Sequence, residues 1–363
     1  MDHYQPLIER FAIEGDVLSI KSYGNGLINK TLLVETTKKR YIFQSINNNV
    51  FPDVDMLMNN IDQVTSHLRS KGVTTLEIVK TKDGRLYEEV DGSFYRGYLF
   101  IESSVCYEKP SSLEMVRQTG LGFGSFHKNL VDIDISHIGD VIKGFHDTRK
   151  RYHDFVDIVN KNPVDRLYFC QDEVDFLLSR KLDYPVIVEG IKDGSVGLRI
   201  THNDPKINNI AFDKDTNQVK CVLDLDTVML GSYLYDFGDC LRSLFTGDNE
   251  DNFDTRKLKV DLDIYRSFLD GYYQEMTGAL SSKELRLLPF SILLITEELA
   301  MRFLGDFING DKYFGIKYPT HNLVRARSQI ALAKDIIKHY EELDDITGDV
   351  VLKYNFPKFV RVD

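Results

Sequence analysis

The sequence contains no tryptophan and only four cysteines, none of them in a C-x-x-C pair. Cysteines scattered in this way give no basis for a zinc site or for a framework of disulfide bonds. Basic side chains are also in the minority, with 45 Lys and Arg against 56 Asp and Glu, a net charge of −11. Because nucleic acids and anionic membranes attract basic surfaces, this balance disfavours both as nonspecific partners. The cysteines are Cys106, Cys170, Cys221 and Cys240.

Long uninterrupted apolar runs are missing as well. The first 15 residues lack the apolar core of a signal peptide. The most apolar stretch, residues 287–304, is interrupted by Glu297, Glu298 and Arg302, so we expect a buried helix there rather than a membrane span. These absences predict a cytoplasmic protein without a membrane partner.

The length of 363 residues allows two sizeable cores, and the apolar pattern changes after residue 102. Short runs separated by Asn-Gly and Asp-Gly turns come first, and apolar residues at helical spacing follow. We therefore expect an α+β fold of the protein-kinase type, with a small antiparallel-sheet lobe (1–102) and a larger, mainly helical lobe (103–363). The expected strands are 17–23, 31–35, 40–46, 76–79, 86–90 and 94–101, and the expected helices are 57–68, 113–130, one around 174–177, 283–307 and 322–343.

One short polar segment carries the densest group of chemically active side chains. Its pattern is H-x-D-x-x-x-x-N, with His202, Asp204 and Asn209, which is the layout of the protein-kinase catalytic loop. An aspartate in such a loop can take a proton from an attacking hydroxyl, and an asparagine carbonyl oxygen suits Mg²⁺. Asp, Asn and Pro also cluster in ordinary turns. The spacing nevertheless favours a phosphoryl-transfer site with Asp204 as the base and Asn209 as a metal ligand.

A second metal ligand is expected at the end of a hairpin. Two apolar runs, 210–212 and 219–223, flank a polar turn, and Asp224 follows them directly. The hairpin would fold Asp224 back toward Asn209, where both could bind Mg²⁺. Asp226 is a secondary candidate for the same role.

The letters of Asp236, Phe237 and Gly238 match the kinase metal motif D-F-G, but their position argues against that role. Asp236 lies 27 positions after Asn209, whereas Asp224 lies 15 positions after it. We expect Asp236 and Asp239 instead to begin a helix, because acidic residues are favoured near the positive end of the helix dipole.

The nucleotide is expected to contact the first lobe. Gly24, Asn25 and Gly26 form the turn of its first hairpin, where backbone N–H groups can approach phosphate oxygens. Most Asn-Gly pairs are ordinary hairpin turns, so the position in the lobe supports this interpretation more than the letters do. Ile101 and Glu102 lie at the lobe boundary, the expected hinge, whose backbone could hydrogen-bond adenine.

Beyond these motifs, the sequence resembles the aminoglycoside phosphotransferase/choline kinase superfamily and, more narrowly, the bacterial N-acetylhexosamine 1-kinases. The resemblance covers nearly the whole chain, and the blocks after residue 300 are specific to the narrower group. The matching blocks are residues 41–44, 61–65, 198–204, 224–227, 236–239, 301–304, 317–319 and 321–325.

The resemblance implies ATP- and Mg²⁺-dependent phosphorylation of the anomeric hydroxyl of N-acetylglucosamine or N-acetylgalactosamine, giving the 1-phosphate. Asp204 matches the catalytic base of the family, and Asn209 and Asp224 match its metal ligands. Arg302 and Tyr313 match positions that contact the sugar. A small-molecule sugar substrate is thus the expected partner, and the sequence does not rank the two sugars.

The residues alone leave other interpretations of the sugar positions open. Arg302 lies four positions after Glu298, so the two could form a pair on a helix surface. Tyr313 could equally be a packing residue beside Phe314.

Two positions depart from related patterns. Gln44 occupies the strand position where protein kinases carry a phosphate-binding lysine, and the resembled sugar kinases also carry glutamine there. The phosphate charge is then left to Mg²⁺ and to Lys30 or Lys206. Leu27 stands where the sugar kinases carry histidine, which would shift substrate preference if that histidine contacts sugar.

Two further hypotheses compete with a hexosamine kinase. The same fold could act on an aminoglycoside, choline, homoserine or another sugar. Choline kinases need an aromatic or acidic cage for the quaternary ammonium, and nothing in the sequence assembles one. The chain could also be an inactive nucleotide-binding module, but Asp204, Asn209 and Asp224 are all intact.

Overall fold

The computed structural model describes residues 4–24, 30–247 and 253–355. They form two compact units, each built from separate stretches of the chain. The sheet unit comprises residues 1–105, 132–143 and 211–230, and the helical unit comprises 106–131, 144–210 and 231–363. The antiparallel sheet and the predominantly helical second part confirm the predicted α+β class. The lobe boundary at 102/103 stays a prediction.

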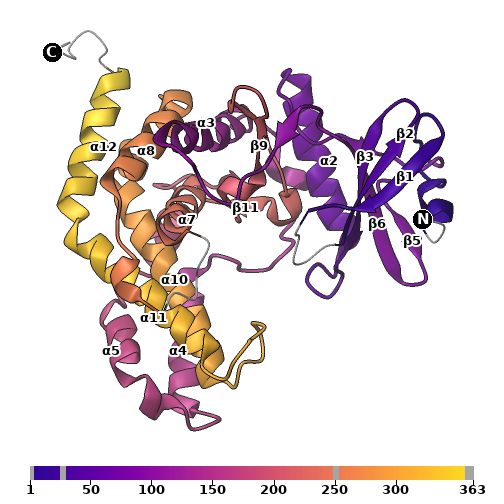
Figure 1. The fold of residues 1–363 in the computed structure, drawn as a ribbon. Coiled ribbons are helices and arrows are strands. Elements are labelled where there is room, and N and C mark those ends of the chain that lie inside the picture. Colours follow the sequence, from indigo (N-terminus) through magenta and orange to yellow (C-terminus); the bar gives the residue numbers. More distant parts are fainter. Residues whose placement is uncertain (1–3, 25–29, 248–252, 356–363) are drawn as a thin grey trace. The chain divides into compact units, whose positions relative to one another are not determined.

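The main sheet of the sheet unit is antiparallel, with strand order β1-β2-β3-β6-β4 and with β5 paired to β6 (Figure 1). Buried and half-buried residues alternate along β2 and β3, because one face of the sheet covers a core that includes Phe11, Val34 and Phe43. The predicted strands are confirmed, although several are shorter. The strands are β1 (Val17–Ser22), β2 (Thr31–Thr36), β3 (Arg40–Ile46), β4 (Ile78–Val79), β5 (Glu88–Val90) and β6 (Ser93–Leu99).

Two helices and a second sheet complete this unit. In α2 (Val54–Ser70), the Asp53 carboxylate accepts a hydrogen bond from the Met56 backbone N–H, and the apolar residues of the predicted helix 57–68 are buried. The predicted hairpin is confirmed, because β9 (Ile210–Asp213) lies between β10 and β7 in a three-stranded sheet. The remaining elements are α1 (Gln5–Ile8), β7 (Ser104–Val105), β10 (Val219–Val222), β11 (Met229–Gly231), η1 (Ile135–His137) and η4 (Leu225–Thr227).

The helical unit is organised around long packed helices. Helix α8 contacts both α3 and α12, and α10 contacts α4, α7 and α11 (Figure 1). The α3–α8 approach requires glycine, since a Cβ on Gly271 would lie 2.0 Å from the Arg117 carbonyl oxygen. The elements are α3 (Leu113–Asn129), α4 (Thr148–Lys161), η2 (Leu167–Phe169), α5 (Gln171–Ser179), α6 (Val186–Lys192), β8 (Arg199–Thr201), η3 (Ile207–Asn209), α7 (Tyr233–Thr246), η5 (Thr255–Lys257), α8 (Leu262–Met276), α9 (Ser282–Arg286), α10 (Leu288–Ile308), α11 (His321–Lys338) and α12 (Tyr340–Asn355).

Two predicted helices are each divided in the structure. The segment 283–307 forms α9 and then α10, because Pro289 lacks an N–H donor and is accommodated in the first turn of a new helix. The segment 322–343 forms α11 and the start of α12, with His339 closing α11. Apolar spacing continues across both breaks, so periodicity alone predicted single helices. Within the described parts of the chain, no helix is long and apolar enough to cross a membrane.

Candidate active site

The catalytic loop, residues 202–209, connects β8 to the short helix η3 in the helical unit. The Asp204 side chain is 35% exposed, and its Oδ1 lies 2.7 Å from the Lys206 ammonium. The Asn209 side-chain amide donates a hydrogen bond of 2.8 Å to the Asp204 backbone carbonyl. Because the amide nitrogen is used in this way, the Asn209 carbonyl oxygen is the atom left for a cation. The loop thus combines a solvent-reachable carboxylate with an oriented oxygen ligand.

Asp236 binds the backbone of this loop from the first turn of α7. One carboxylate oxygen accepts from the His202 N–H at 2.6 Å, and the other accepts from the Asn203 N–H at 2.7 Å. Asn203 has a left-handed φ of 64°, which for a residue other than glycine needs support from its surroundings. Asp236 supplies that support directly before the proposed base, Asp204.

A buried histidine holds Asp236 in place. His127, in the last turn of α3, contacts the Asp236 carboxylate through Nε2 at 2.8 Å and the Tyr272 hydroxyl through Nδ1 at 3.0 Å. Burial alone would raise the pKa of Asp236, but the hydrogen bond and charge of His127 outweigh it, and the pKa lies below its ordinary value. Asp236 is therefore ionised at neutral pH, and the three groups tie α3 and α8 to the catalytic loop.

The D-F-G letters are thus explained by packing of the helical unit. Asp236 lies in the first turn of a helix, as predicted, although Asp239 lies further along and pairs with Arg242. The Phe237 ring is buried against aromatic rings of α8. A Cβ on Gly238 would lie 2.4 Å from the Ser291 carbonyl oxygen, so glycine is required where α7 crosses α10. Sequence reasoning missed that Asp236 binds the catalytic loop, since its helical position alone could not reveal a partner 34 residues earlier.

The second proposed metal ligand lies in the sheet unit. Asp224 is exposed and adopts a left-handed conformation with φ of 54°, directly before η4. Asp226, within η4, is buried and forms an ion pair of 2.5 Å with Arg96. No cluster of three or more His, Cys, Asp or Glu side chains suited to a metal occurs in the described part of the chain. Taken singly, the Asp224 carboxylate and the Asn209 carbonyl are each the kind of oxygen ligand that suits Mg²⁺, which keeps several waters.

The predicted nucleotide contacts also belong to the sheet unit. Gly24 has a φ of +70°, a conformation suited to glycine, whereas Asn25, Gly26 and Leu27 lie outside the described residues. The Ile101 carbonyl accepts from the Ser104 hydroxyl, and the Glu102 carbonyl accepts from Lys220. The carbonyls of the expected hinge are thus already bonded within the unit.

Arg302 lies among aromatic side chains of the helical unit. Its guanidinium carbon lies 5.5 Å from the Phe145 ring centre, 5.9 Å from that of Tyr313 and 5.4 Å from that of Phe314. Cations attract aromatic faces at these distances. Tyr313 is 71% exposed and its ring contacts that of Phe314 at 4.8 Å, so packing against Phe314 is compatible with an exposed position. We call Arg302 and these three rings the Arg302 cluster.

The alternative of a surface pair between Glu298 and Arg302 is wrong, because Glu298 is buried. Its carboxylate contacts His146 at 3.1 Å and Arg151 at 3.2 Å. Burial would raise the pKa of Glu298, but the nearby His146, Arg151 and Arg302 hold it below its ordinary value. The His146 ring in turn stacks on Tyr235 at 4.9 Å, next to Asp236 in α7. The Glu298 group and the catalytic loop therefore share the first turn of α7.

The loop that carries Tyr313 is organised by another carboxylate. Asp306, near the end of α10, accepts hydrogen bonds of 2.9 Å from the backbone N–H groups of Lys312, Tyr313 and Phe314. The Asn322 amide binds the same carboxylate at 3.0 Å. Four donors on one buried aspartate fix the loop that carries Tyr313 and Phe314.

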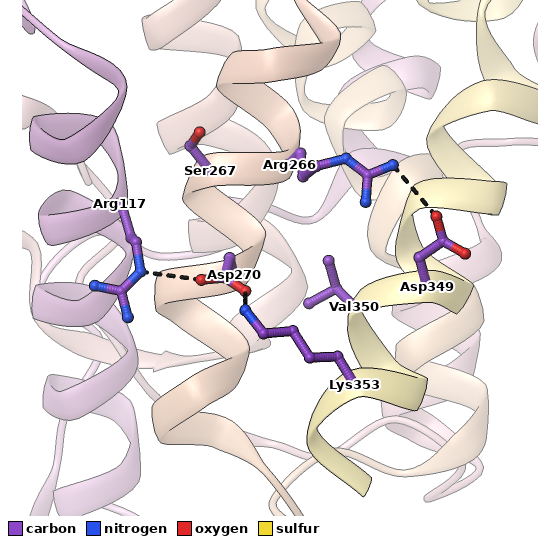
Figure 2. A pocket seen from close by; sticks show the side chains of 7 residues that line it. All are labelled: Arg117, Arg266, Ser267, Asp270, Asp349, Val350 and Lys353. Atoms are coloured by element: carbon purple, nitrogen blue, oxygen red, sulfur yellow. Dashed lines mark hydrogen bonds and ion pairs between the residues drawn. The ribbon is translucent and has the colours of Figure 1, made fainter. Parts of the chain in front are cut away.

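A separate pocket of about 310 Å³ lies between α3, α8 and α12 (Figure 2). Its charged side chains are paired with one another: Arg117 and Lys353 both contact Asp270, and Arg266 contacts Asp349. Its lining includes no residue of the catalytic loop. We interpret it as a groove closed by ion pairs that join three helices.

Residues 19–272 match the sequence pattern of the family described as "Phosphotransferase enzyme family" (APH). The chain belongs to this family. The match includes the catalytic loop, Asp224 and Asp236, which accords with a transferase site built on the loop.

Solved structures share the fold of this phosphotransferase family member. They include a microcompartment-associated aminopropanol kinase (14% identity over 94% of this chain and 97% of that one, TM-score 0.60). A GDP and kanamycin complex of APH(2″)-IIIa matches with 14% identity over 96% and 99% of the two chains, TM-score 0.56. A choline kinase from Streptococcus pneumoniae matches with 15% identity over 92% and 96%, TM-score 0.52. Identities this low establish the fold and not the acceptor.

Proposed function

We propose that the protein transfers the γ-phosphoryl group of ATP to the anomeric hydroxyl of N-acetylglucosamine or N-acetylgalactosamine. The observation that carries the reaction type is the catalytic loop, in which the half-buried Asp204 lies beside the oriented amide of Asn209. Lys206 binds Oδ1 of Asp204, so we assign Oδ2 as the oxygen that accepts the hydroxyl proton. Mg²⁺, held by Asn209 and Asp224, would neutralise phosphate charge.

The nucleotide contacts of this proposal lie in the sheet unit. The Ile101 and Glu102 carbonyls already accept hydrogen bonds from Ser104 and Lys220. We therefore assign adenine recognition to backbone N–H donors of this segment. Gly24, with Asn25 and Gly26, stays the proposed phosphate-covering turn.

The charge of the Arg302 cluster supports a neutral acceptor. The guanidinium groups of Arg302 and Arg151 both lie near one carboxylate, that of Glu298. This buried carboxylate already forms an ion pair with His146. A protonated amine brought beside Arg302 would meet a like charge. An acetamido group carries no charge, and the exposed Tyr313 ring offers a face for a sugar. The amino-alcohol and aminoglycoside acceptors named for the structural neighbours are therefore the less favoured alternative.

The discriminating experiment compares N-acetylglucosamine with glucosamine, which differ in the acetyl group and hence in charge. We expect kcat/KM to be at least about 100-fold higher for the acetylated sugar, since placing like charges together costs several kcal/mol. The assay measures ATP consumption with both sugars, N-acetylgalactosamine, choline, ethanolamine, aminopropanol and kanamycin. Phosphorus NMR identifies the phosphorylated oxygen. Turnover restricted to amine acceptors, or phosphate on an oxygen other than the anomeric one, would contradict the proposal.

The substitution Asp306→Ala should weaken sugar binding selectively. It removes the acceptor of three backbone N–H groups and so releases the loop that carries Tyr313. We expect KM for the sugar to rise at least about tenfold, corresponding to 1.4 kcal/mol, while KM for ATP stays within about twofold. Steady-state kinetics with each substrate varied in turn provide the measurement.

A matched control for this variant is Asp335→Ala. Asp335 also accepts a hydrogen bond from a loop backbone N–H, that of Val260, but not from the Tyr313 loop. An equal increase of KM for the sugar in both variants would show that Asp306 has no specific role at the acceptor site. An increase of KM for ATP alone would show the same.

A further inference from the structure

We infer that Arg96 positions the metal-binding loop of the sheet unit and determines that Asp224, rather than Asp226, is the metal ligand. The inference rests on the proposed phosphoryl transfer and deepens it by assigning a residue that the sequence motifs do not identify. All the contacts that carry it lie within the sheet unit.

Arg96 is a buried cation in the middle of the main sheet. It lies on β6, only 1% of the residue is exposed, and its register partner on β3 is Gln44. The Gln44 side-chain oxygen accepts two hydrogen bonds from the guanidinium, from Nε at 3.1 Å and from Nη2 at 2.9 Å. The Gln44 amide nitrogen donates to the Thr31 hydroxyl on β2 at 3.1 Å. Three neighbouring strands therefore fix the orientation of the guanidinium.

The third guanidinium nitrogen binds the metal loop. Nη1 lies 2.5 Å from Oδ1 of Asp226, whose side chain is 7% exposed. Asn60 on α2 holds the same loop from another direction, through a hydrogen bond of 2.9 Å to the Val228 carbonyl. The loop is thus attached to the sheet by Arg96 and to α2 by Asn60.

Asp224 lies two positions before Asp226, in the segment that these attachments hold. Its left-handed φ of 54° is uncommon for residues other than glycine, although aspartate tolerates it. Asp226 engages the buried Arg96, whereas Asp224 is exposed. Because Asp226 is committed to Arg96, Asp224 is the one of the two carboxylates that a metal ion can reach from solvent. Arg96 thereby separates the roles of the two aspartates.

Gln44 is part of the same arrangement. Protein kinases carry a lysine at this strand position, and a lysine ammonium at residue 44 would face the Arg96 guanidinium and repel it. A neutral amide instead offers Arg96 an acceptor oxygen. The glutamine at this position is therefore the residue that a buried arginine on β6 requires.

The test measures metal binding directly, without turnover. Electron paramagnetic resonance titrates Mn²⁺ into the full-length protein in the presence of ADP. Substituting groups that orient a metal ligand typically weakens metal binding by about 10–100-fold, and we expect at least a tenfold weaker Kd for Arg96→Met. Arg96→Lys should recover part of the affinity. Lysine restores the positive charge but not the planar guanidinium, which binds Gln44 and Asp226 at the same time. A wild-type Kd in folded Arg96→Met would overturn the inference.

Two further variants separate positioning from general stability. Arg10→Met breaks an ion pair with the largely buried Glu88 in the same unit, without changing a contact of the metal loop described above, and should leave the Mn²⁺ Kd within about twofold. If Arg96→Met does not fold, the double variant Arg96→Met/Asp226→Leu removes both buried charges and should fold. It should still bind Mn²⁺ at least about tenfold more weakly than wild type, because the loop is no longer attached to the sheet.

A double-mutant cycle completes the test. Gln44→Lys should weaken Mn²⁺ binding in the wild type, because the new ammonium repels the Arg96 guanidinium. It should have little further effect in Arg96→Met, where that guanidinium is absent. Additive effects would overturn the proposed coupling. Because the measurement needs no acceptor, failure to phosphorylate any hexosamine would refute the proposed function without affecting this result.

Discussion

Replacing Asp204 with asparagine should lower kcat by about 10²–10⁴-fold, the usual contribution of a positioned general base. Asparagine preserves the shape of the side chain but cannot accept the hydroxyl proton as a carboxylate does. The Asp204 backbone carbonyl, which Asn209 binds at 2.8 Å, is unaffected by the exchange. The loop should therefore keep its structure while losing the base.

The measurement pairs single-turnover kinetics with the Kd for ADP, which we expect to change less than about twofold because Asp204 acts on the acceptor. Asp215→Asn is the matched control, since this aspartate lies exposed in the hairpin turn between β9 and β10. Unchanged turnover in Asp204→Asn would remove Asp204 from its assigned role. A parallel loss of ADP binding would show that the substitution damages the nucleotide site.

The Asp236→Asn substitution should reduce both stability and turnover. The carboxylate accepts two backbone N–H groups of the catalytic loop and contacts His127, all in a buried environment. An amide keeps one acceptor oxygen but turns its NH₂ group toward one of the two backbone N–H donors, His202 or Asn203. Breaking a buried charged pair typically costs 3–5 kcal/mol, so we expect a loss of roughly 3 kcal/mol in the free energy of unfolding, measured by urea denaturation.

Activity should also fall by at least about tenfold in this variant, because the backbone directly before Asp204 loses its support and small misplacements reduce turnover strongly. The control is Asp239→Asn on the same helix, which removes an ion pair with Arg242 rather than a contact with the loop. Loss of stability in both variants with loss of kcat only in Asp236→Asn is the expected pattern. A normal kcat in folded Asp236→Asn would contradict the anchoring role.

Acidification offers an independent check on Asp236. Because its pKa in the folded protein lies below the ordinary value of 3.8, its stabilising contribution is present above that value and is lost as the pH falls through the folded pKa. The asparagine variant has no such group. Its stability should therefore decline less than that of the wild type below about pH 4.

Local pattern was enough to predict much of the architecture. Alternating and helical spacing predicted the strands and helices because burial follows those periods. It failed near Pro289, where a new helix begins, and at His339, where a helix ends, because apolar spacing continues across both breaks. The sheet unit also includes residues 132–143 and 211–230, an association that tertiary contacts create and sequence order does not display.

The site was predictable where spacing encodes chemistry and unpredictable where partners are distant. The spacing from His202 to Asn209 is that of a kinase catalytic loop, and the roles of Asp204 as base and Asn209 as metal ligand stay predictions. Asp236 and Arg96 bind partners 34 and 130 positions away in the sequence (236 against 202, 96 against 226), and no local signal marks them. Hydrophobicity would even have argued against a buried arginine on a central strand.

The first turn of α7 has a practical consequence for redesign of the acceptor. Tyr235 stacks on His146 of the Glu298 group, and Asp236 binds the catalytic loop, so two adjacent residues attach both parts of the proposed site to one helix. A mutant library aimed at a new acceptor should keep these two positions constant. Diversity should be confined to residues 302, 313 and 314. The proposed base, Asp204, then keeps its position, because Asp236 still binds the backbone before it.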